Sequence, residues 1–265
     1  MSIEINNQSI VLVISEKGGT GKTTISQQVV APWLLKTIGA VGLIELDDVN
    51  TSARSSWLTK SKIKTISKNV GSKATKVLSD ILFDEKRKDP LVIDVGGNIT
   101  SQNIINALKD SGQANYYAFA VVPVREEGDD VLVARQTINA LREARPDFPI
   151  LIALNNITDF DDVEDEFAQV FALANELDVE ILQVPRMRFV HRSQLNGQTL
   201  YEQCEKREEL LKSAYAEEAN AMGASDFKKA RAINEVRVMI NSLRKTENQL
   251  NDVFDKLDAF IKADK

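Results

Sequence analysis

Six short runs of apolar residues, separated by longer stretches with helical spacing, constrain the fold more than any other feature of this sequence. The runs are continuously apolar, which is typical of strands covered on both faces of a parallel sheet. They span residues 10–15, 41–46, 91–95, 116–123, 150–154 and 179–184. Helical patterns lie between them, for example over residues 23–38, 131–145 and 162–177. This alternation predicts an α/β fold with a doubly wound, mostly parallel sheet.

The C-terminal part of the chain has a different pattern, in which apolar residues recur at alternating steps of three and four. The series consists of Ile233, Val236, Ile240, Leu243, Leu250, Phe254, Leu257 and Ile261, and only Glu247 interrupts it. This spacing predicts a long helix with one narrow apolar seam. The helix either packs along its own domain, or forms a coiled coil or a partner-docking helix. We expect one domain over residues 1–205 and a helical extension over residues 206–265.

Residues that ligate metals or form disulfides are scarce in this sequence. The 265 residues include one cysteine, Cys204, and one histidine, His191. We therefore expect no disulfide framework, zinc clasp, cysteine-ligated cluster or histidine-based triad. The sequence has no run of about 18 apolar residues, and its first ten residues lack the pattern of a secretory signal. These observations predict a reduced, cytoplasmic setting.

The formal net charge of −6 hides an uneven distribution along the chain. Residues 1–76 carry a net charge of +5, residues 77–200 carry −10, and residues 201–265 carry −1. The stretch 49–79 contains no carboxylate, and its cationic residues are Arg54, Lys60, Lys62, Lys64, Lys68, Lys73 and Lys76. A local anion-binding face is therefore compatible with the overall negative charge.

A glycine-rich loop lies directly between the first expected strand and the first expected helix. Its residues are Lys17, Gly18, Gly19, Thr20, Gly21, Lys22, Thr23 and Thr24. In such a loop, backbone N–H groups converge on phosphate oxygens, and the helix N-terminus adds partial positive charge. Lys22 would contact the β- and γ-phosphates, and the Thr23 hydroxyl would ligate Mg²⁺. We therefore predict that the loop binds ATP with Mg²⁺; the alternative is a glycine-rich turn that only caps the helix.

The loop departs from the usual G-x-x-x-x-G-K-[ST] pattern, because Glu16 replaces the first glycine and a second lysine, Lys17, follows it. In this respect it resembles the deviant Walker A motif of the ParA/MinD family of dimerising P-loop ATPases. The resemblance implies that residues 1–205 form a P-loop ATPase domain whose residues 18–24 bind the nucleotide. It also implies that two chains dimerise around ATP, with Lys17 reaching the phosphates bound by the other subunit. Lys17 and Lys22 are then both catalytic.

The resemblance continues in residues 43–48 (LIELDD), which occupy the place of the family's first switch. Asp47 matches the aspartate that positions the attacking water, so the resemblance implies a catalytic role for it. Glu45 stands where the family usually has an aspartate, and Asp48 and Val49 replace proline and glutamine. The acidic function is therefore expected at Asp47, while the shape of this switch differs from the family pattern.

Residues 91–94 (LVID) resemble the Walker B strand of the same family. The resemblance implies that Asp94 holds Mg²⁺ through a water and that Thr23 is the other metal-binding residue; the alternative is that Asp94 caps a turn at the strand end. Gly96 and Gly97 supply the backbone freedom expected of a second switch that senses the γ-phosphate.

Later segments resemble the family more weakly. Residues 121–123 (VVP) match a strand that ends in proline, and residues 195–200 match a small-Gly-x-x-Leu stretch. Asn155 stands where relatives contact the adenine edge, although it could instead cap a loop. Pro185, in the Val-Pro-Arg segment that resembles an I-P-R element, is a further expected nucleotide-binding residue.

The leading interpretation of function is a ParA-like ATPase that segregates plasmid DNA or positions another cargo. The resemblance implies an ATP-dependent homodimer that binds double-stranded DNA non-specifically and is nucleoid-associated. It also implies a centromere-binding or cargo adaptor protein that stimulates hydrolysis. Two groups of cations could contact DNA phosphates: Lys60, Lys62, Lys64 and Lys68 in one, and Arg186, Arg188 and Arg192 in the other. Alternatively, the lysine-rich stretch is a solvated, mobile insertion.

The sequence disfavours two other functions of ATPases in this family. A cluster or metal bridged across the dimer needs paired cysteines, and Cys204 is expected instead to be a half-buried helix residue. Membrane docking is not expected either, because aspartates outnumber lysines in residues 251–265 and are repelled by anionic lipid. Since the first expected strand begins at residue 10, we also expect no N-terminal helix-turn-helix.

Two alternative functions remain open. One is a conjugation-accessory ATPase whose long C-terminal helix docks a relaxosome or secretion partner. The other is a dethiobiotin-synthetase-like enzyme that activates a carboxylate with ATP, although the sequence has no motif for its second substrate.

Overall fold

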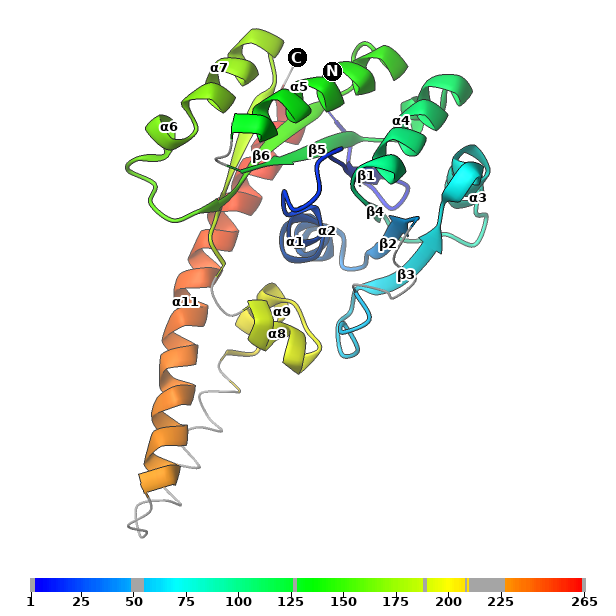
Figure 1. Cartoon of the computed structure of the whole chain (residues 1–265). Helices are drawn as coiled ribbons and strands as arrows, with labels where there is room; N and C mark the ends of the chain where they lie inside the picture. Colours follow the sequence, from blue (N-terminus) through cyan, green and yellow to red (C-terminus); the bar gives the residue numbers. More distant parts are fainter. Residues whose placement is uncertain are drawn as a thin grey trace.

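Seven parallel strands form the centre of this computed structural model, which describes residues 3–48, 55–125, 128–187, 190–207, 209 and 227–263 (Figure 1). The strands are β1 (Ile10–Val13), β2 (Gly42–Asp47), β3 (Lys64–Asn69), β4 (Leu91–Val95), β5 (Phe119–Val124), β6 (Ile150–Ile157) and β7 (Glu180–Pro185). Their order is β3-β2-β4-β1-β5-β6-β7. Every neighbouring pair is parallel. The doubly wound α/β fold expected from the sequence is confirmed.

The edge strand β3 is the element that the apolar runs did not predict. It lies in the lysine-rich stretch and pairs with β2 along its whole length, from Gly42 opposite Lys64 to Asp47 opposite Asn69. Its side chains are exposed or half-buried, and Ile66 is 54% exposed. An edge strand with one uncovered face carries few apolar residues, so it has no continuous apolar run. The interpretation of this stretch as a mobile insertion is wrong for Lys64–Asn69.

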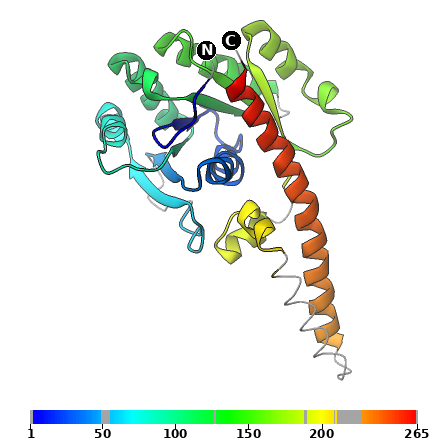
Figure 2. The same ribbon diagram turned by 180° about the vertical axis from the view of Figure 1, so that it is seen from behind.

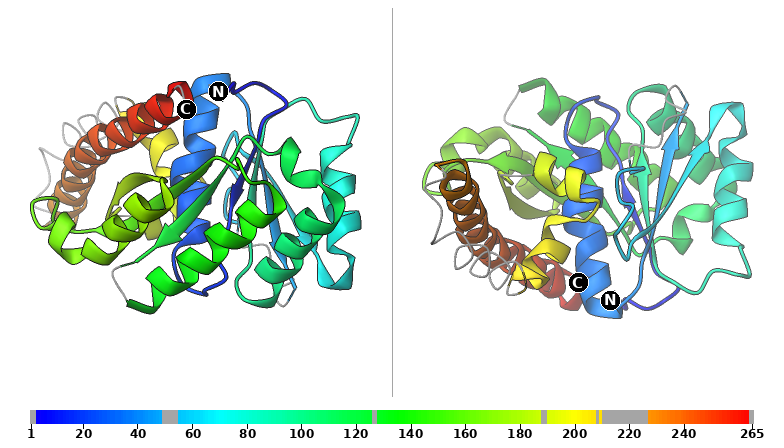
Figure 3. Two further views of the ribbon diagram at one scale, coloured as in Figure 1. Left: turned by 90° about the horizontal axis from the view of Figure 1, so that it is seen from above. Right: turned by 90° about the horizontal axis from the view of Figure 1, so that it is seen from below.

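Five helices cover one face of the sheet (Figure 3). They are α3 (Ala74–Leu82), α4 (Ile99–Ser111), α5 (Gly128–Ala144), α6 (Val163–Glu166) and α7 (Ala168–Leu177). Their apolar side chains pack on alternate strand residues such as Leu12, Ile93 and Ile152. Short 3-10 turns, η2 (Gly71–Lys73) and η3 (Gln113–Tyr116), precede α3 and β5.

The opposite face is covered by the helix that follows β1 and by the C-terminal helices. The first helix consists of α1 (Lys22–Ile25), the π-helical turn η1 (Ser26–Val30) and α2 (Ala31–Ile38). Pro32 has no amide hydrogen for the carbonyl groups of the preceding turn, which is the turn that widens into the π-helix. Trp33 on α2 contacts Phe119 of β5 edge-to-face, with ring centroids 6.0 Å apart. This contact anchors the helix on the centre of the sheet.

The C-terminal helix α11 (Phe227–Lys262) follows α8 (Val190–Asn196) and α9 (Leu200–Glu205). From Leu243 to Ile261 its seam is buried on the same face as α2, and the indole of Trp33 donates a hydrogen bond to Asp258 at 2.8 Å. Glu247, which interrupts the seam, forms an ion pair with Arg207. This part of the helix therefore packs along its own domain, which was one of the two arrangements expected from the sequence. The side chains of Ile233 and Val236 lie outside the described residues, and the boundary at residue 205 stays a prediction.

The first part of α11 extends past the sheet, on the side where α8 and α9 lie (Figure 2). Val238 in this part is 52% exposed. At the other end of the helix the two termini lie close together, and the amide of Ile3 donates to the carbonyl of Ile261 at 2.9 Å. Among the described residues, no helix combines the length and the apolar character needed to cross a membrane.

Candidate nucleotide site

The glycine-rich loop lies at the carboxyl edge of the sheet, where the order of the strands reverses. Strand β1, which leads into the loop, lies between β4 and β5, and β2 and β3 lie beyond β4. In open parallel sheets, ligands bind at this edge and at this reversal. The topology thus brings the ends of β2, β4, β5 and β6 around the loop that the sequence identified.

The backbone of the loop requires glycine at two close contacts. Gly21 has a φ of 97°, and a Cβ atom there would lie 1.8 Å from Nδ2 of Asn155. A Cβ atom on Gly97, in the segment after β4, would lie 3.2 Å from Cα of Gly18. Around Gly18 and Gly19 an added Cβ would meet nothing within 4 Å, and both glycines are exposed.

Both lysines of the loop contact protein groups. Lys22 begins α1, is buried, and donates from Nζ to the backbone carbonyl of Lys17 at 2.7 Å. The Nζ atom of Lys17 lies 2.5 Å from Oδ1 of Asp130 in the first turn of α5. The sequence reasoning missed Asp130, because the two residues are far apart in the chain.

Asp94 and Thr23 meet beside the loop, as the resemblance implied. The pKa of Asp94 is raised to about 6, chiefly by burial and also by the charge of Glu45, whereas hydrogen bonds from the Thr23 and Ser26 hydroxyls and the charge of Lys22 lower it. Within the described part of the chain, Oδ1 of Asp94 has no hydrogen-bond partner. A buried carboxylate oxygen without a donor favours a cation close to it.

These residues fit a magnesium ion that is held partly by nucleotide phosphates. Mg²⁺ in phosphate-binding sites is bound by one or two protein oxygens together with phosphates and waters. Thr23 and Asp94 are such a pair. Among the described residues, no group of three or more His, Cys, Asp or Glu side chains could hold a metal ion by itself.

The end of β2 carries three carboxylates in different surroundings. Glu45 is buried and accepts hydrogen bonds from Nε2 of Gln27 at 3.3 Å and from the hydroxyl of Ser67 at 2.8 Å. Asp47 is half-buried, and a Cβ atom on Gly96 would lie 3.2 Å from its Cγ. Asp47 is thus placed next to the segment that follows β4, where the second switch is expected. Val49, which completes the expected first switch, lies outside the described residues.

Asp48 has a structural role that the sequence did not indicate. Its Oδ1 accepts from the amide of Gly71 at 2.5 Å, and its Oδ2 accepts from Nδ2 of Asn103 at 3.2 Å. Its own amide donates to the hydroxyl of Thr100 at 3.2 Å. The residue that replaces the family's proline therefore ties the end of β2 to α4 and to the turn before α3. The sequence signal for this role is that an aspartate stands at position 48, where the family has a proline.

Asn155 holds the loop itself. Its side chain is buried at the end of β6 and donates to the carbonyl of Thr20 at 3.0 Å. This contact agrees with the loop-capping alternative, and the adenine contact stays a prediction.

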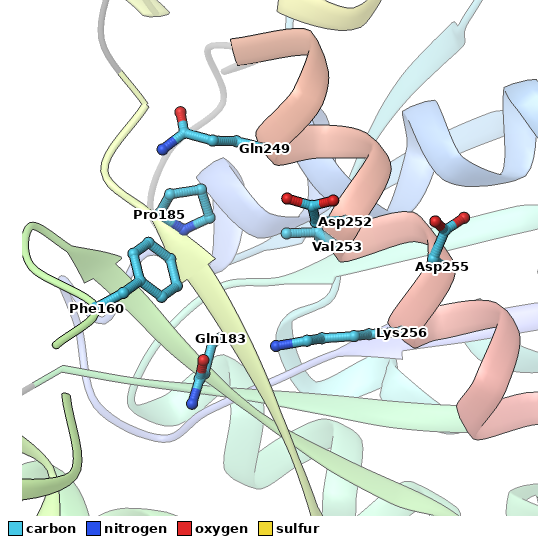
Figure 4. Close-up of a pocket in the computed structure, with 8 residues that line it drawn as sticks. All are labelled: Phe160, Gln183, Pro185, Gln249, Asp252, Val253, Asp255 and Lys256. Carbon is cyan, nitrogen blue, oxygen red and sulfur yellow. The ribbon is translucent and has the colours of Figure 1, made fainter. Parts of the chain in front are cut away.

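Pro185 lies at the end of β7, where its ring and that of Phe160 face the same pocket (Figure 4). The pocket has a volume of about 500 Å³ and separates β7 from α11. Its other lining residues are Gln183, Gln249, Asp252, Val253, Asp255 and Lys256. Val184, between Gln183 and Pro185 in sequence, pairs with Asn155 of β6, so the pocket lies at the strand next to β6. Nucleotide binding by Pro185 stays a prediction.

The structure places the first residues of the lysine-rich stretch against α8 and α9. The amide of Lys60 donates to the carbonyl of Gly197, between α8 and α9, at 2.9 Å, and the amide of Lys62 donates to Glu202 of α9 at 2.7 Å. Lys60, Lys62, Lys64 and Arg186 are exposed, Lys68 is half-buried, and Lys64 forms an ion pair with Asp89. Arg54, Arg188 and the side chain of Arg192 lie outside the described residues.

A parallel sheet of this strand order, with a glycine-rich loop between its central strand and a helix, defines the P-loop nucleoside-triphosphatase fold, here of the MinD/ParA type. The MinD cell division protein of Aquifex aeolicus is similar, with 15% identity and a TM-score of 0.52 over 91% of this chain and 97% of that protein. MinD in the MinC:MinD complex of Aquifex aeolicus has 15% identity and a TM-score of 0.51 over 91% and 96%. Apo McdA of Cyanthece has 14% identity and a TM-score of 0.52 over 75% and 93%. No protein-family model and no curated protein matches the sequence.

Proposed function

We propose that this chain is an ATPase of the ParA/MinD family, which dimerises when it binds ATP with Mg²⁺. The observation that supports this most is the pair Thr23 and Asp94 beside a loop that carries lysines at both of its ends. A loop that only capped a helix would not need a buried carboxylate with an unpartnered oxygen next to it.

In this proposal each residue of the site has a stated task. Backbone N–H groups of residues 18–24 and the amine of Lys22 bind the phosphates. Thr23 and Asp94 would hold Mg²⁺, which when bound offsets phosphate charge. Asp47 orients a water that attacks the γ-phosphorus, and the bond from that phosphorus to the β–γ bridging oxygen breaks to give ADP and phosphate. Lys17 of the second chain offsets the charge that develops on the transferred group.

The surface around Lys17 is suited to a second copy of the chain. A hollow of about 300 Å³ is lined by Glu16, Lys17, Asn98, Ile99, Gln102 and Val133. Ile99 in this lining is 66% exposed. An exposed apolar side chain beside the loop favours burial against a partner surface, and a symmetric dimer brings the same side chain from both copies.

The ATP-bound dimer would bind double-stranded DNA without sequence preference and act in segregating a plasmid or positioning another cargo. The support is that the cationic side chains of Lys60, Lys62, Lys64 and Arg186 are exposed. A dimer doubles the number of these cations, so DNA affinity should depend on ATP and fall steeply with salt. We propose that a centromere-binding or cargo adaptor protein stimulates hydrolysis, and that the chain is cytoplasmic and nucleoid-associated.

Molar mass in solution tests the proposal. Light scattering should give a monomer with ADP and a dimer with Mg²⁺ and a slowly hydrolysed ATP analogue, and the dimer should co-elute with duplex DNA. Lys22→Ala should remove nucleotide binding because it removes the charge at the phosphates, whereas Lys36→Ala, on α2, is a matched lysine control. A wild-type chain that stays monomeric when saturated with the analogue would contradict the proposal.

One observation supports a second candidate, a conjugation-accessory ATPase whose α11 docks a partner. The first part of α11 extends past the sheet and exposes Val238. Val238→Asp should then abolish binding of a relaxosome or secretion partner and leave ATP-dependent dimerisation unchanged. Deleting the whole helix would not test this, because its second half belongs to the core.

A further inference from the structure

The backbone of residues 60–62 is held by the segment that contains the start of α9. The amide of Lys62 donates to Oε1 of Glu202 at 2.7 Å, and the hydroxyl of Ser61 donates to Oε2 of the same carboxylate at 2.8 Å. The carbonyl of Lys60 accepts from Nε2 of Gln198 at 3.2 Å. The side chains of Lys60 and Lys62 remain exposed. These contacts therefore fix the course of the chain and leave both amines at the surface.

The order of this segment depends on Glu202, because the lysine-rich stretch 49–79 contains no carboxylate of its own. Repulsion between its cations opposes a single compact conformation. Glu202 is 2% exposed and also accepts from the amide and the hydroxyl of Thr199, at 3.0 and 2.9 Å. These donors hold the carboxylate at the first turn of α9, so residues 60–62 are only as well placed as that end of the helix.

The start of α9 is in turn attached to the helix that follows the glycine-rich loop. Oε1 of Gln28 accepts from the amide of Leu200, the first residue of α9, at 2.9 Å. Gln28 is 1% exposed, and its Nε2 atom has no acceptor among the described residues. A buried donor without an acceptor is unfavourable, and an apolar side chain of the same size would avoid it. The glutamine is therefore explained by its bond to Leu200 and not by packing alone.

This glutamine belongs to the π-helical turn η1, which also contacts the candidate magnesium site and β3. The hydroxyl of Ser26 donates to Asp94. Gln27 donates to Glu45, whose other oxygen accepts from Ser67 of β3 at 2.8 Å. π-helical turns occur frequently at functional sites. Because η1 follows directly on α1, a nucleotide held by α1 acts on the turn that carries all these contacts.

We propose that Gln28 couples the nucleotide site to residues 60–62, so that a bound nucleotide orders the cations that would bind DNA. The proposal rests on the proposed function, in which α1 binds phosphates and the lysine-rich stretch contacts DNA. A nucleotide restrains α1 and η1, and through Leu200 and Glu202 the restraint extends to residues 60–62. An ordered segment loses less conformational freedom when it binds phosphate groups, so its affinity for DNA rises. Gln28 is a positioning residue, because it acts through α9.

Hydrogen exchange with ADP tests the coupling without DNA and without a dimer, because the proposed function gives a monomer with ADP. In wild type, the amides of residues 60–62 should exchange about fivefold more slowly when ADP and Mg²⁺ saturate the site, which is a small coupling between two sites. Gln28→Met keeps the length of the side chain and removes its oxygen, so this slowing should be lost. Gln28→Glu keeps an oxygen that can accept from Leu200 and should retain the slowing. Gln169→Met, at an exposed position on α7, is the matched control and should behave as wild type.

The outcomes separate the coupling from the proposed function. Slowing at residues 60–62 that disappears in Gln28→Met, while this variant still binds ADP, supports the coupling. No slowing in wild type saturated with ADP, or equal slowing in Gln28→Met, overturns the coupling and leaves the proposed function standing. If wild type binds neither ADP nor a slowly hydrolysed ATP analogue, the proposed function fails and the coupling with it. Exchange in β5 checks that Gln28→Met folds, and Glu202→Gln, which interrupts the same contacts at α9, repeats the test if it does not.

Discussion

Replacing Asp94 by asparagine is expected to stabilise the nucleotide-free protein, although it removes a carboxylate that the site needs. Burial raises the pKa of Asp94 from 3.8 to about 6. A carboxyl group whose pKa is raised on folding favours the folded state most below its unfolded-chain pKa, and this contribution is lost as the pH rises through about 6. The shift corresponds to an unfavourable contribution to the free energy of folding of ~3 kcal/mol at pH 8 and about half of that at pH 5. A neutral asparagine does not carry this cost.

Urea unfolding in the presence of a chelator measures the effect. The free energy of unfolding of Asp94→Asn minus that of wild type should be larger at pH 8 than at pH 5 by about 1.5 kcal/mol. Comparing two pH values cancels the pH-independent consequences of the substitution, such as the changed hydrogen bond with Thr23. Asp110→Asn, an exposed carboxylate on α4, is the control and should show no such change. An equal difference at both pH values would refute the electrostatic reasoning.

Three further predictions concern the loop, the first switch and the cationic surface. Asp47→Ala should leave ATP-dependent dimers that no longer release phosphate, because the water loses its orienting carboxylate; normal turnover would assign that role elsewhere. Gly21→Ala should lower the free energy of unfolding by about 2 kcal/mol, because alanine is strained at positive φ and its Cβ would displace the side-chain amide of Asn155. Urea unfolding measures this change, and a variant as stable as wild type would contradict the prediction. Replacing Lys60, Lys62, Lys64 and Lys68 by glutamine should weaken DNA binding and reduce its salt dependence, which fluorescence anisotropy measures from about 50 to 200 mM salt. An unchanged salt dependence would exclude these lysines as DNA contacts.

The features that the sequence predicted well are local ones. A strand, a glycine-rich turn and a helix follow each other within about thirty residues, so the loop and its place in the sheet could be identified from residue spacing alone. Asp94 and Thr23 could be paired only through the family resemblance, and the structure brings them together. Asp130 was missed because its contact with Lys17 joins positions more than a hundred residues apart, which no spacing rule reveals.

Two other limits of the sequence have physical causes. Strand β3 is polar because it lies at the sheet edge, so hydrophobic periodicity has little to detect there. The seam of α11 was recognised, but an apolar stripe has the same spacing whether it packs on its own sheet or on another chain. Only the tertiary contacts, such as that between Trp33 and Asp258, show that the stripe from Leu243 onwards packs on its own domain.

Glu45, which departs from the family pattern, contributes to the electrostatics of the candidate magnesium site. It lies in register with Asp94 on the neighbouring strand, so the two side chains project from the same face of the sheet. Gln27 and Ser67 donate to both oxygens of Glu45, whereas Oδ1 of Asp94 has no donor among the described residues. The carboxylate of Asp94 is therefore less fully neutralised than that of Glu45, and the charge of Glu45 adds to the cost of keeping Asp94 ionised. A cation placed there would be attracted by both carboxylates, so Glu45 keeps at this position the negative charge that an aspartate would supply.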